Sequence, residues 1–214
     1  SLLHVVEKTA RNVFIPLTVG GGIRNLDDIS QCLRAGADKV AINTAAIRNP
    51  HFISQAAERF GSSTVVLHID AKQNKSGGWT AWTDNGREPS ALAVQEWAKR
   101  AAELGCGEIL VTSIDADGTT RGLDHKLLAA VAENVCVPVL ASGGADNPES
   151  IANFVSSVDV SAVCVGSILH YRIAQQLVKS GYEFRASGDF KVLAEARNFT
   201  RVIPTSIEEI KRAL

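Results

Sequence analysis

The sequence predicts an α/β protein: an incomplete (β/α)8 barrel with about six of its eight strands present. Two observations lead to this prediction, an alternation of strand-like and helix-like segments along the 214 residues and an internal repeat of half the pattern. Such alternation implies parallel strands whose faces are covered by helices. Doubly wound sheets show it as well, so the repeat decides in favour of a barrel.

Strands are expected where short apolar runs are rich in β-branched residues, and helices where apolar residues recur with a helical period. The expected strands cover residues 13–19, 39–42, 64–69, 108–112, 137–140 and 161–165. The expected helices cover residues 26–35, 50–60, 91–104, 125–134, 148–155 and 206–214. Pro50 and Pro148 suit the first turn of a helix, and Asn49 and Asn147 before them are the expected caps.

An internal repeat relates the two halves of the chain. Residues 21–29 align without gaps with residues 143–151, since both begin with Gly-Gly and carry Asn at the fifth and Ile at the ninth position. One strand later, residues 40–44 align with residues 163–167. Four strands and four helices, repeated once, make a barrel of about 250 residues, so two further strands are expected before residue 1. We expect a single domain over residues 1–214, with residues 172–214 as an extended C-terminal segment.

Composition narrows the classes of function. Hydrophobic residues make up 45% of the chain, and 22 basic against 23 acidic residues give a formal charge of -1. Without a basic run, neither nucleic acid nor an anionic membrane is an expected partner, and no apolar stretch is long enough to span a bilayer. The four cysteines lack the paired spacing of zinc sites or disulfides, so we expect buried free thiols in a cytoplasmic protein.

Glycine-rich loops after two strands predict phosphate sites. Consecutive glycines let backbone N–H groups approach an anion closely, at the positive end of the following helix. Tight turns are the alternative role for such glycines, but two loops related by the repeat favour two phosphate sites, and a substrate with a phosphate at each end. The residues are Gly21 and Gly22 with Asn43 and Thr44 beside them, and Gly143 and Gly144 with Gly166 and Ser167 beside them.

An aspartate ends the strand expected at residues 64–69. Strand alternation places Val66, His68 and Asp70 on one face. Barrel enzymes hold their catalytic groups at the carboxyl ends of the strands, so Asp70 could serve as a general acid or base. Its alternative role is to cap a helix or bind a loop.

Two further pairs of residues lie at strand ends. Asp117 and Gly118 follow the strand at residues 108–112, where they either reach a substrate or make a tight turn. Lys39 and Glu108 begin their strands at the opposite end. Inward-pointing charges there could form a ring at the bottom of the barrel, or an ordinary ion pair.

Together these motifs resemble the cyclase subunit of imidazole glycerol phosphate synthase. Residues 15–24, Ile-Pro-Leu-Thr-Val-Gly-Gly-Gly-Ile-Arg, resemble its third strand and loop, and residues 36–46 resemble its fourth. Residues 69–72, 107–115 and 141–145 continue in the family's order. The resemblance covers about residues 1–171.

The resemblance implies a lyase of histidine biosynthesis. A glutaminase, separate or fused, would supply ammonia through the barrel to a bis-phosphorylated aminoimidazole carboxamide ribonucleotide in its ribulosyl form. The products would be imidazole glycerol phosphate and aminoimidazole carboxamide ribotide, with no cofactor and no metal. Asp70 matches one of two catalytic aspartates, and Lys39 and Glu108 match half of an ammonia gate. Gly22, Asn43 and Thr44 match one phosphate site, while Asp117, Gly118, Ser142, Gly143, Gly144 and Ser167 match residues around the other phosphate or the substrate.

Three features depart from the family's pattern. Its first two strands, the first of which carries the other catalytic aspartate, have no counterpart in this sequence. His68 stands where the family usually has a small residue, and the segment at residues 172–205 is an insert without an expected role. In addition, residues 75–89, with Trp79 and Trp82, are either a mobile flap over the substrate or a short exterior hairpin.

Two alternative functions stay open at the level of the sequence. The first is the sugar isomerase that precedes the cyclase in the same pathway, which shares two phosphate sites and an aspartate pair. The second is a non-catalytic barrel fragment that needs a complementing N-terminal piece to close its sheet, because unpaired strand edges favour association.

Overall fold

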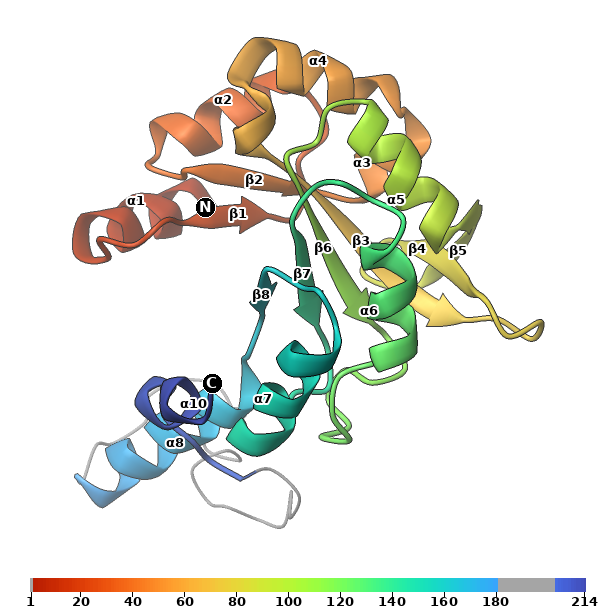
Figure 1. The fold of residues 1–214 in the computed structure, drawn as a ribbon. Helices are drawn as coiled ribbons and strands as arrows, with labels where there is room; N and C mark the ends of the chain where they lie inside the picture. The colour runs from red at the N-terminus through yellow and green to blue at the C-terminus, as the bar shows by residue number, and fades with distance from the viewer. Residues whose placement is uncertain (1, 181–202) are drawn as a thin grey trace.

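The computed structural model describes residues 2–180 and 203–214. Its central feature is a curled sheet of parallel strands in the order β1-β2-β3-β6-β7-β8, with an antiparallel hairpin, β4 and β5, attached to β3. Figure 1 shows a C-shaped molecule in which helices cover the outside of the sheet. The strands are β1 (Thr18–Gly20), β2 (Lys39–Ile42), β3 (Val65–Gln73), β4 (Trp79–Thr83), β5 (Glu88–Ala93), β6 (Glu108–Ser113), β7 (Val139–Ser142) and β8 (Ala162–Val163).

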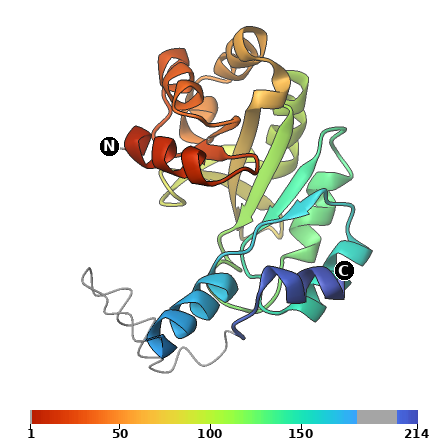
Figure 2. The same cartoon turned by 90° about the vertical axis from the view of Figure 1, so that its left-hand side faces the viewer.

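Strands that follow one another in the chain as βα units lie side by side, as they do in a (β/α)8 barrel. Within the described residues β1 and β8 form the two edges, and both views show the opening between them (Figures 1 and 2). The fold is therefore an incomplete (β/α)8 barrel. The helices are α1 (Leu2–Asn12), α2 (Leu26–Arg34), α3 (Thr44–Arg48), α4 (His51–Phe60), α5 (Val94–Glu103), α6 (His125–Ala132), α7 (Pro148–Ser157), α8 (Ser167–Lys179) and α10 (Ile207–Ala213).

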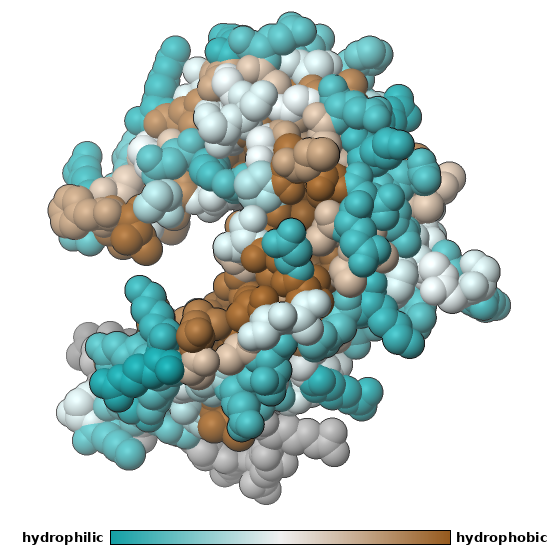
Figure 3. All heavy atoms as spheres, viewed as in Figure 1, coloured by the Kyte–Doolittle hydropathy of each residue, from teal (hydrophilic) through white to brown (hydrophobic). Residues whose placement is uncertain are grey.

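The core lies between the sheet and its helices. Outward-facing side chains such as Leu67 and Ile69 of β3 and Ile109 of β6 are at most 1% exposed. Inward-facing positions differ, since His68 and Leu110, which are partners in the sheet register, are only partly buried. Figure 3 shows apolar residues along the hollow that this inner face forms. The inner face, which a closed barrel would bury, is thus open to solvent.

The predicted first strand is partly wrong. The expected range was residues 13–19, but β1 begins only at Thr18, and Phe14 and Ile15 before it are 94% and 71% exposed. The reason lies in Asp38, whose carboxylate accepts a hydrogen bond of 2.7 Å from the N–H of Leu17. That N–H therefore donates to a side chain and not to the backbone of β2, at the point where the parallel pairing of β1 with β2 starts. The other five strands lie where they were expected, β2 with the expected bounds and the remaining four with shifted ends.

One of the two predicted helix caps is confirmed. Asn147 accepts from the N–H of Ser150, and Pro148 occupies the first turn of α7. Asn49, in contrast, does not cap α4: its own N–H still donates to Ala45 of α3, and the cap position falls one residue later, on Pro50. The short helix α3, which the sequence did not indicate, therefore displaces the expected cap.

The prediction of four buried thiols is wrong for half of them. Cys32 and Cys106 are buried, and burial raises the pKa of Cys106 to about 12. Cys136 and Cys164 are exposed. Cys164 follows β8, the edge strand, where no described strand covers it. All four cysteines are free.

The internal repeat is visible in the last helix. The predicted helix at residues 206–214 is confirmed as α10, which begins with a capping box between Ser206 and Glu209. Ile210 of α10 packs with Ile151 of α7 and Ile168 of α8. Because α4 lies against α2 in the first half, α10 takes the position in the second half that α4 has in the first. Most of the expected insert lies outside the described residues. Over residues 2–180 and 203–214, no helix is both long and apolar enough to cross a membrane.

Candidate active site

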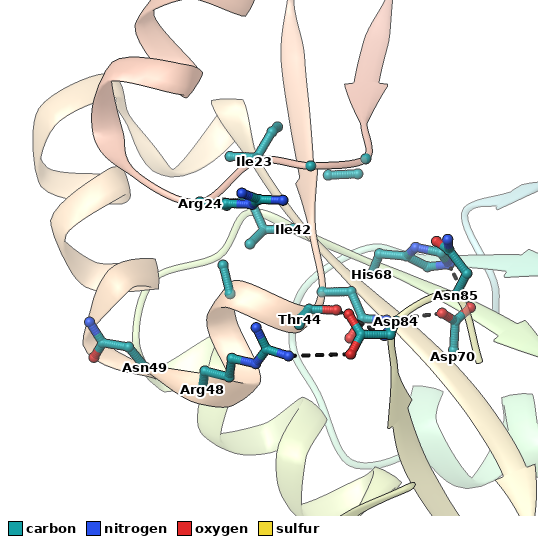
Figure 4. A pocket seen from close by; sticks show the side chains of 15 residues that line it. Ile23, Arg24, Ile42, Thr44, Arg48, Asn49, His68, Asp70, Asp84 and Asn85 are labelled. Carbon is teal, nitrogen blue, oxygen red and sulfur yellow. Dashed lines mark hydrogen bonds and ion pairs between the residues drawn. The ribbon is translucent and has the colours of Figure 1, made fainter. Parts of the chain in front are cut away.

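A cavity of about 760 Å³ lies at the carboxyl ends of β1, β2 and β3 (Figure 4). Three parts of the chain form it: the glycine loop after β1, the end of β2 with helix α3, and the inner face of β3. The turn of the β4–β5 hairpin adds a further wall. Predicted site residues that line this cavity are Gly22, Asn43, Thr44 and Asp70.

The glycine loop after β1 is open toward the cavity. Gly21 and Gly22 have φ angles of +95° and +77°, which residues with a side chain rarely adopt. A Cβ atom at either position would meet nothing within 4 Å. Arg24 follows in the same cavity wall, and its N–H already donates to the carboxylate of Asp28. The loop therefore offers backbone and free space, as an anion site requires.

Asp70 ends the inner face of β3 and is 9% exposed. Its Oδ2 atom accepts a hydrogen bond of 2.9 Å from the amide of Asn43, which also donates to the carbonyl oxygen of Trp82 at 3.0 Å. Both donors of Asn43 are thereby directed toward Asp70 and the hairpin. The Oδ1 atom of Asn43 is buried and has no hydrogen-bond partner among the described residues. The structure thus brings Asn43 to the aspartate and leaves one buried acceptor of its amide without a partner.

The other oxygen of Asp70 faces His68. Nε2 of His68 lies 3.3 Å from Oδ1 of Asp70 and 3.0 Å from Oγ1 of Thr112. Burial lowers the pKa of His68 below its usual value, and the negative charge of Asp70 opposes this shift. Thr112 was not singled out from the sequence. The signal that would have found it is the sheet register, in which it pairs with Asp70 across β3 and β6.

The segment at residues 75–89 forms the hairpin of β4 and β5. Its turn reaches α3, because the N–H of Asp84 donates to Oγ1 of Thr44 at 3.0 Å and its carboxylate lies 3.2 Å from Arg48 (Figure 4). Asp84 and Asn85 both adopt positive φ angles, which lets the turn bend tightly. The hydroxyl of Thr44, a predicted phosphate ligand, therefore accepts from the hairpin turn.

The second glycine loop is covered by the chain itself. Gly143 and Gly144 are buried, and a Cβ on Gly143 would lie 2.7 Å from the carbonyl oxygen of Ser113. The N–H of Gly122 donates to the carbonyl oxygen of Gly144 at 3.0 Å. The loop after β6 therefore packs on these glycines. The remaining predicted residues lie at the carboxyl ends of β6, β7 and β8, outside the first cavity: Asp117, Gly118, Ser142, Gly166 and Ser167.

Lys39 and Glu108 form an ion pair at the amino ends of β2 and β6. Their strands are separated by β3, so the pair bridges the inner face beside Val66, the register partner of Glu108. Both side chains are partly exposed, at 27% and 22%. The predicted contact between the two charges is thus present, at the end of the sheet opposite Asp70.

Comparisons with known proteins agree with the fold. The model of the family described as histidine biosynthesis protein matches residues 1–175. Over 171 residues the chain is 48% identical to the imidazole glycerol phosphate synthase subunit HisF of Bacillus cereus. The alignment covers 80% of this chain and 68% of that protein. The chain therefore belongs to the histidine biosynthesis protein family.

Proposed function

We propose that the chain works as the cyclase subunit of imidazole glycerol phosphate synthase. The observation that carries this proposal is the position of Asp70: a nearly buried carboxylate shares one cavity with an open, glycine-lined anion site. A substrate phosphate on the glycine loop would hold the reacting part of the molecule beside that carboxylate. The 48% identity to a HisF subunit supports the same assignment.

In the proposed reaction, ammonia attacks the ribulosyl form of the bis-phosphorylated aminoimidazole carboxamide ribonucleotide. Ring closure and cleavage then release imidazole glycerol phosphate and aminoimidazole carboxamide ribotide. Both steps need protons to be moved at the reacting carbons and nitrogens, and a carboxylate at hydrogen-bond distance can move them. Asp70 supplies one such group, and the amide of Asn43 donates to it from the end of β2. The family's other aspartate, on its first strand, has no counterpart in residues 1–214.

The two phosphates would occupy the two glycine loops. The first loop provides N–H groups and free space at Gly21 and Gly22, and the guanidinium groups of Arg24 and Arg48 line the same cavity. The second phosphate would lie at the ends of β7 and β8, near Ser142, Gly166 and Ser167. Asp117 and Gly118 lie in the loop that covers Gly143 and Gly144, so this loop would have to adjust when the second phosphate binds.

Ammonia would come from a glutaminase partner at the amino ends of the strands. The Lys39–Glu108 pair lies at that end, and the inner face of β3 leads from there past Val66 and His68 to Asp70. A small neutral molecule could follow this inner face once the barrel is closed. We assign the ion pair to the entrance of that path.

The proposal is tested with the full protein as its gene encodes it, supplied with the ribulosyl substrate and ammonium chloride in place of the glutaminase. We expect turnover, a loss of about 100-fold or more in kcat for Asp70→Asn, and unchanged kcat for Asp159→Asn, an exposed aspartate remote from the cavity. Isomerisation of the preceding sugar substrate without ammonia would contradict the proposal in favour of the isomerase. No turnover of either substrate would favour the non-catalytic fragment.

A further inference from the structure

His68 is a polar side chain on the inner face of β3, and the proposed reaction does not use it. It stands one inward position before Asp70, with 29% of its side chain exposed against 12% for Asp70. Its Nε2 atom is hydrogen-bonded to Oγ1 of Thr112 at 3.0 Å and lies 3.3 Å from Oδ1 of Asp70. An apolar core position would not orient the ring in this way.

The two contacts determine where the imidazole proton lies. An ionised carboxylate has acceptors only, so a favourable contact with Asp70 requires a hydrogen on Nε2 of His68. The hydroxyl of Thr112 can accept from the same N–H, or donate elsewhere, and is compatible with this tautomer. The opposite tautomer would turn a lone pair of Nε2 toward the carboxylate. A favourable contact with Asp70 therefore calls for the Nε2–H form.

Asn43 and His68 approach the carboxylate of Asp70 from two sides. Asn43 of the β2 end donates to Oδ2 at 2.9 Å, and His68 of β3 faces Oδ1. A carboxyl group held through one oxygen can still rotate about its bond to Cβ, whereas one held through both oxygens is fixed in plane. Catalytic groups gain efficiency when their orientation is fixed before the substrate binds.

We propose that His68 is a positioning residue that fixes the Asp70 carboxylate in its reactive orientation, with Thr112 anchoring the imidazole. This inference rests on the proposed function, in which Asp70 carries the acid–base chemistry. His68 itself touches neither the glycine loop nor the hairpin through a hydrogen bond, and its contribution acts through Asp70.

Asp70 is the carboxylate in contact with the imidazole, while Arg24, Arg48 and Asp84 line the same cavity without an ion-pair contact to it. On β2 the side chain facing Asp70 is the uncharged Asn43, and on β6 it is the uncharged Thr112. The charged groups of these strands, Lys39 and Glu108, bind each other at the amino ends. Asp70 is therefore the charge to which the protonation of His68 responds.

The kinetic test compares three variants of the full protein, assayed with the ribulosyl substrate and ammonium chloride. His68→Ala removes the donor, and His68→Gln keeps an N–H near the position of Nε2. Leu110→Ala is the matched control, because it removes inward-facing volume from the register partner of His68 without touching Asp70. We expect kcat to fall about tenfold in His68→Ala with little change in KM, to recover to within about threefold in His68→Gln, and to stay within about twofold in Leu110→Ala.

Wild-type kcat in His68→Ala, or a loss that Leu110→Ala reproduces, would overturn the inference. A wild-type protein without cyclase turnover would instead refute the proposed function. A second measurement addresses the contact itself: nitrogen NMR of the His68 ring. We expect the Nε2–H tautomer in the wild type and a lower pKa of His68 in Asp70→Asn, because the carboxylate raises that pKa. An Nδ1–H tautomer, or a pKa of His68 that is the same in Asp70→Asn as in the wild type, would overturn the inference independently of activity.

Discussion

The amide of Asn43 donates a hydrogen bond of 2.9 Å to Oδ2 of Asp70, although the two residues are 27 positions apart in the chain. The contact arises because β2 and β3 are parallel neighbours in register, with Ile42 opposite Leu67. The same amide also binds the carbonyl oxygen of Trp82. Asn43 therefore joins three elements that surround the cavity: the end of β2, the end of β3 and the hairpin.

Replacing Asn43 by Ala is expected to lower kcat about tenfold or more, because Asp70 loses a donor and the hairpin loses its connection to β2. Steady-state kinetics with saturating ammonium chloride measures the effect. Asn134→Ala is the matched control, since Asn134 is exposed just after α6 and its side-chain amide donates to the carbonyl oxygen of Ala130 in the preceding turn. Equal kcat values for the two variants would contradict the role given to Asn43.

Gly22 and Gly61 allow backbone strain to be separated from phosphate binding. Both have positive φ angles, +77° and +88°, and neither lies against a close neighbour. Alanine at either position should cost about 1 kcal/mol in the free energy of unfolding, because a side chain is strained there. Only Gly22→Ala should also raise KM for the substrate, by about tenfold, since Gly61 is at the end of α4, away from the cavity. Denaturant unfolding and KM, measured on both variants, check this. A similar KM for the two would argue against a phosphate at the first loop.

The partly buried position of His68 predicts a pH dependence of stability. Its pKa is lowered by burial in the folded protein, so the unfolded chain binds a proton at a higher pH than the folded one does. As the pH falls through the unfolded value near 6.5, the free energy of unfolding decreases until the folded pKa is reached. Denaturant titrations between about pH 7.5 and pH 5 should therefore show a smaller loss in His68→Ala than in the wild type. Parallel curves for the two proteins would contradict a pKa of His68 that folding lowers.

The cysteines should divide into two pairs under a thiol reagent. Cys136 and Cys164 are exposed and should react in the native protein, Cys164 the more slowly because partial burial raises its pKa. Cys32 and Cys106 are buried, with raised pKa values, and should react only after unfolding. Quantifying the released chromophore before and after denaturation checks this. Reaction of all four thiols in the native protein would show that the helix layer opens readily.

Alternation and repeat together were sufficient to predict the strand order, because in a barrel each βα unit places its strand beside the preceding one. They located β2 without error and α10 to within a residue at each end. The start of β1 could not be read in this way, since it depends on the side chain of Asp38 reaching Leu17 from the neighbouring strand. The same is true of α3, whose five residues are too few to show a helical period.

The candidate site was predictable as a set of strand ends but not as a set of contacts. The inward direction of His68 and Asp70 follows from the alternation of β3 alone. The amide of Asn43 turns to Asp70, and the hydroxyl of Thr44 accepts from the hairpin turn, only because β2, β3 and β4 come together in the sheet. Likewise, Gly143 and Gly144 gave the same sequence signal as Gly21 and Gly22, yet the loop after β6 covers only the second pair.

The central claim is that Asp70 drives the incorporation of ammonia beside the open glycine loop. The most direct measurement supplies the full protein with ¹⁵N-labelled ammonium chloride and the ribulosyl substrate, and follows the label into the imidazole ring by NMR. We expect labelled imidazole glycerol phosphate with the wild type and almost none with Asp70→Asn. Label that forms equally well without the Asp70 carboxylate, or that never enters the ring, would contradict it.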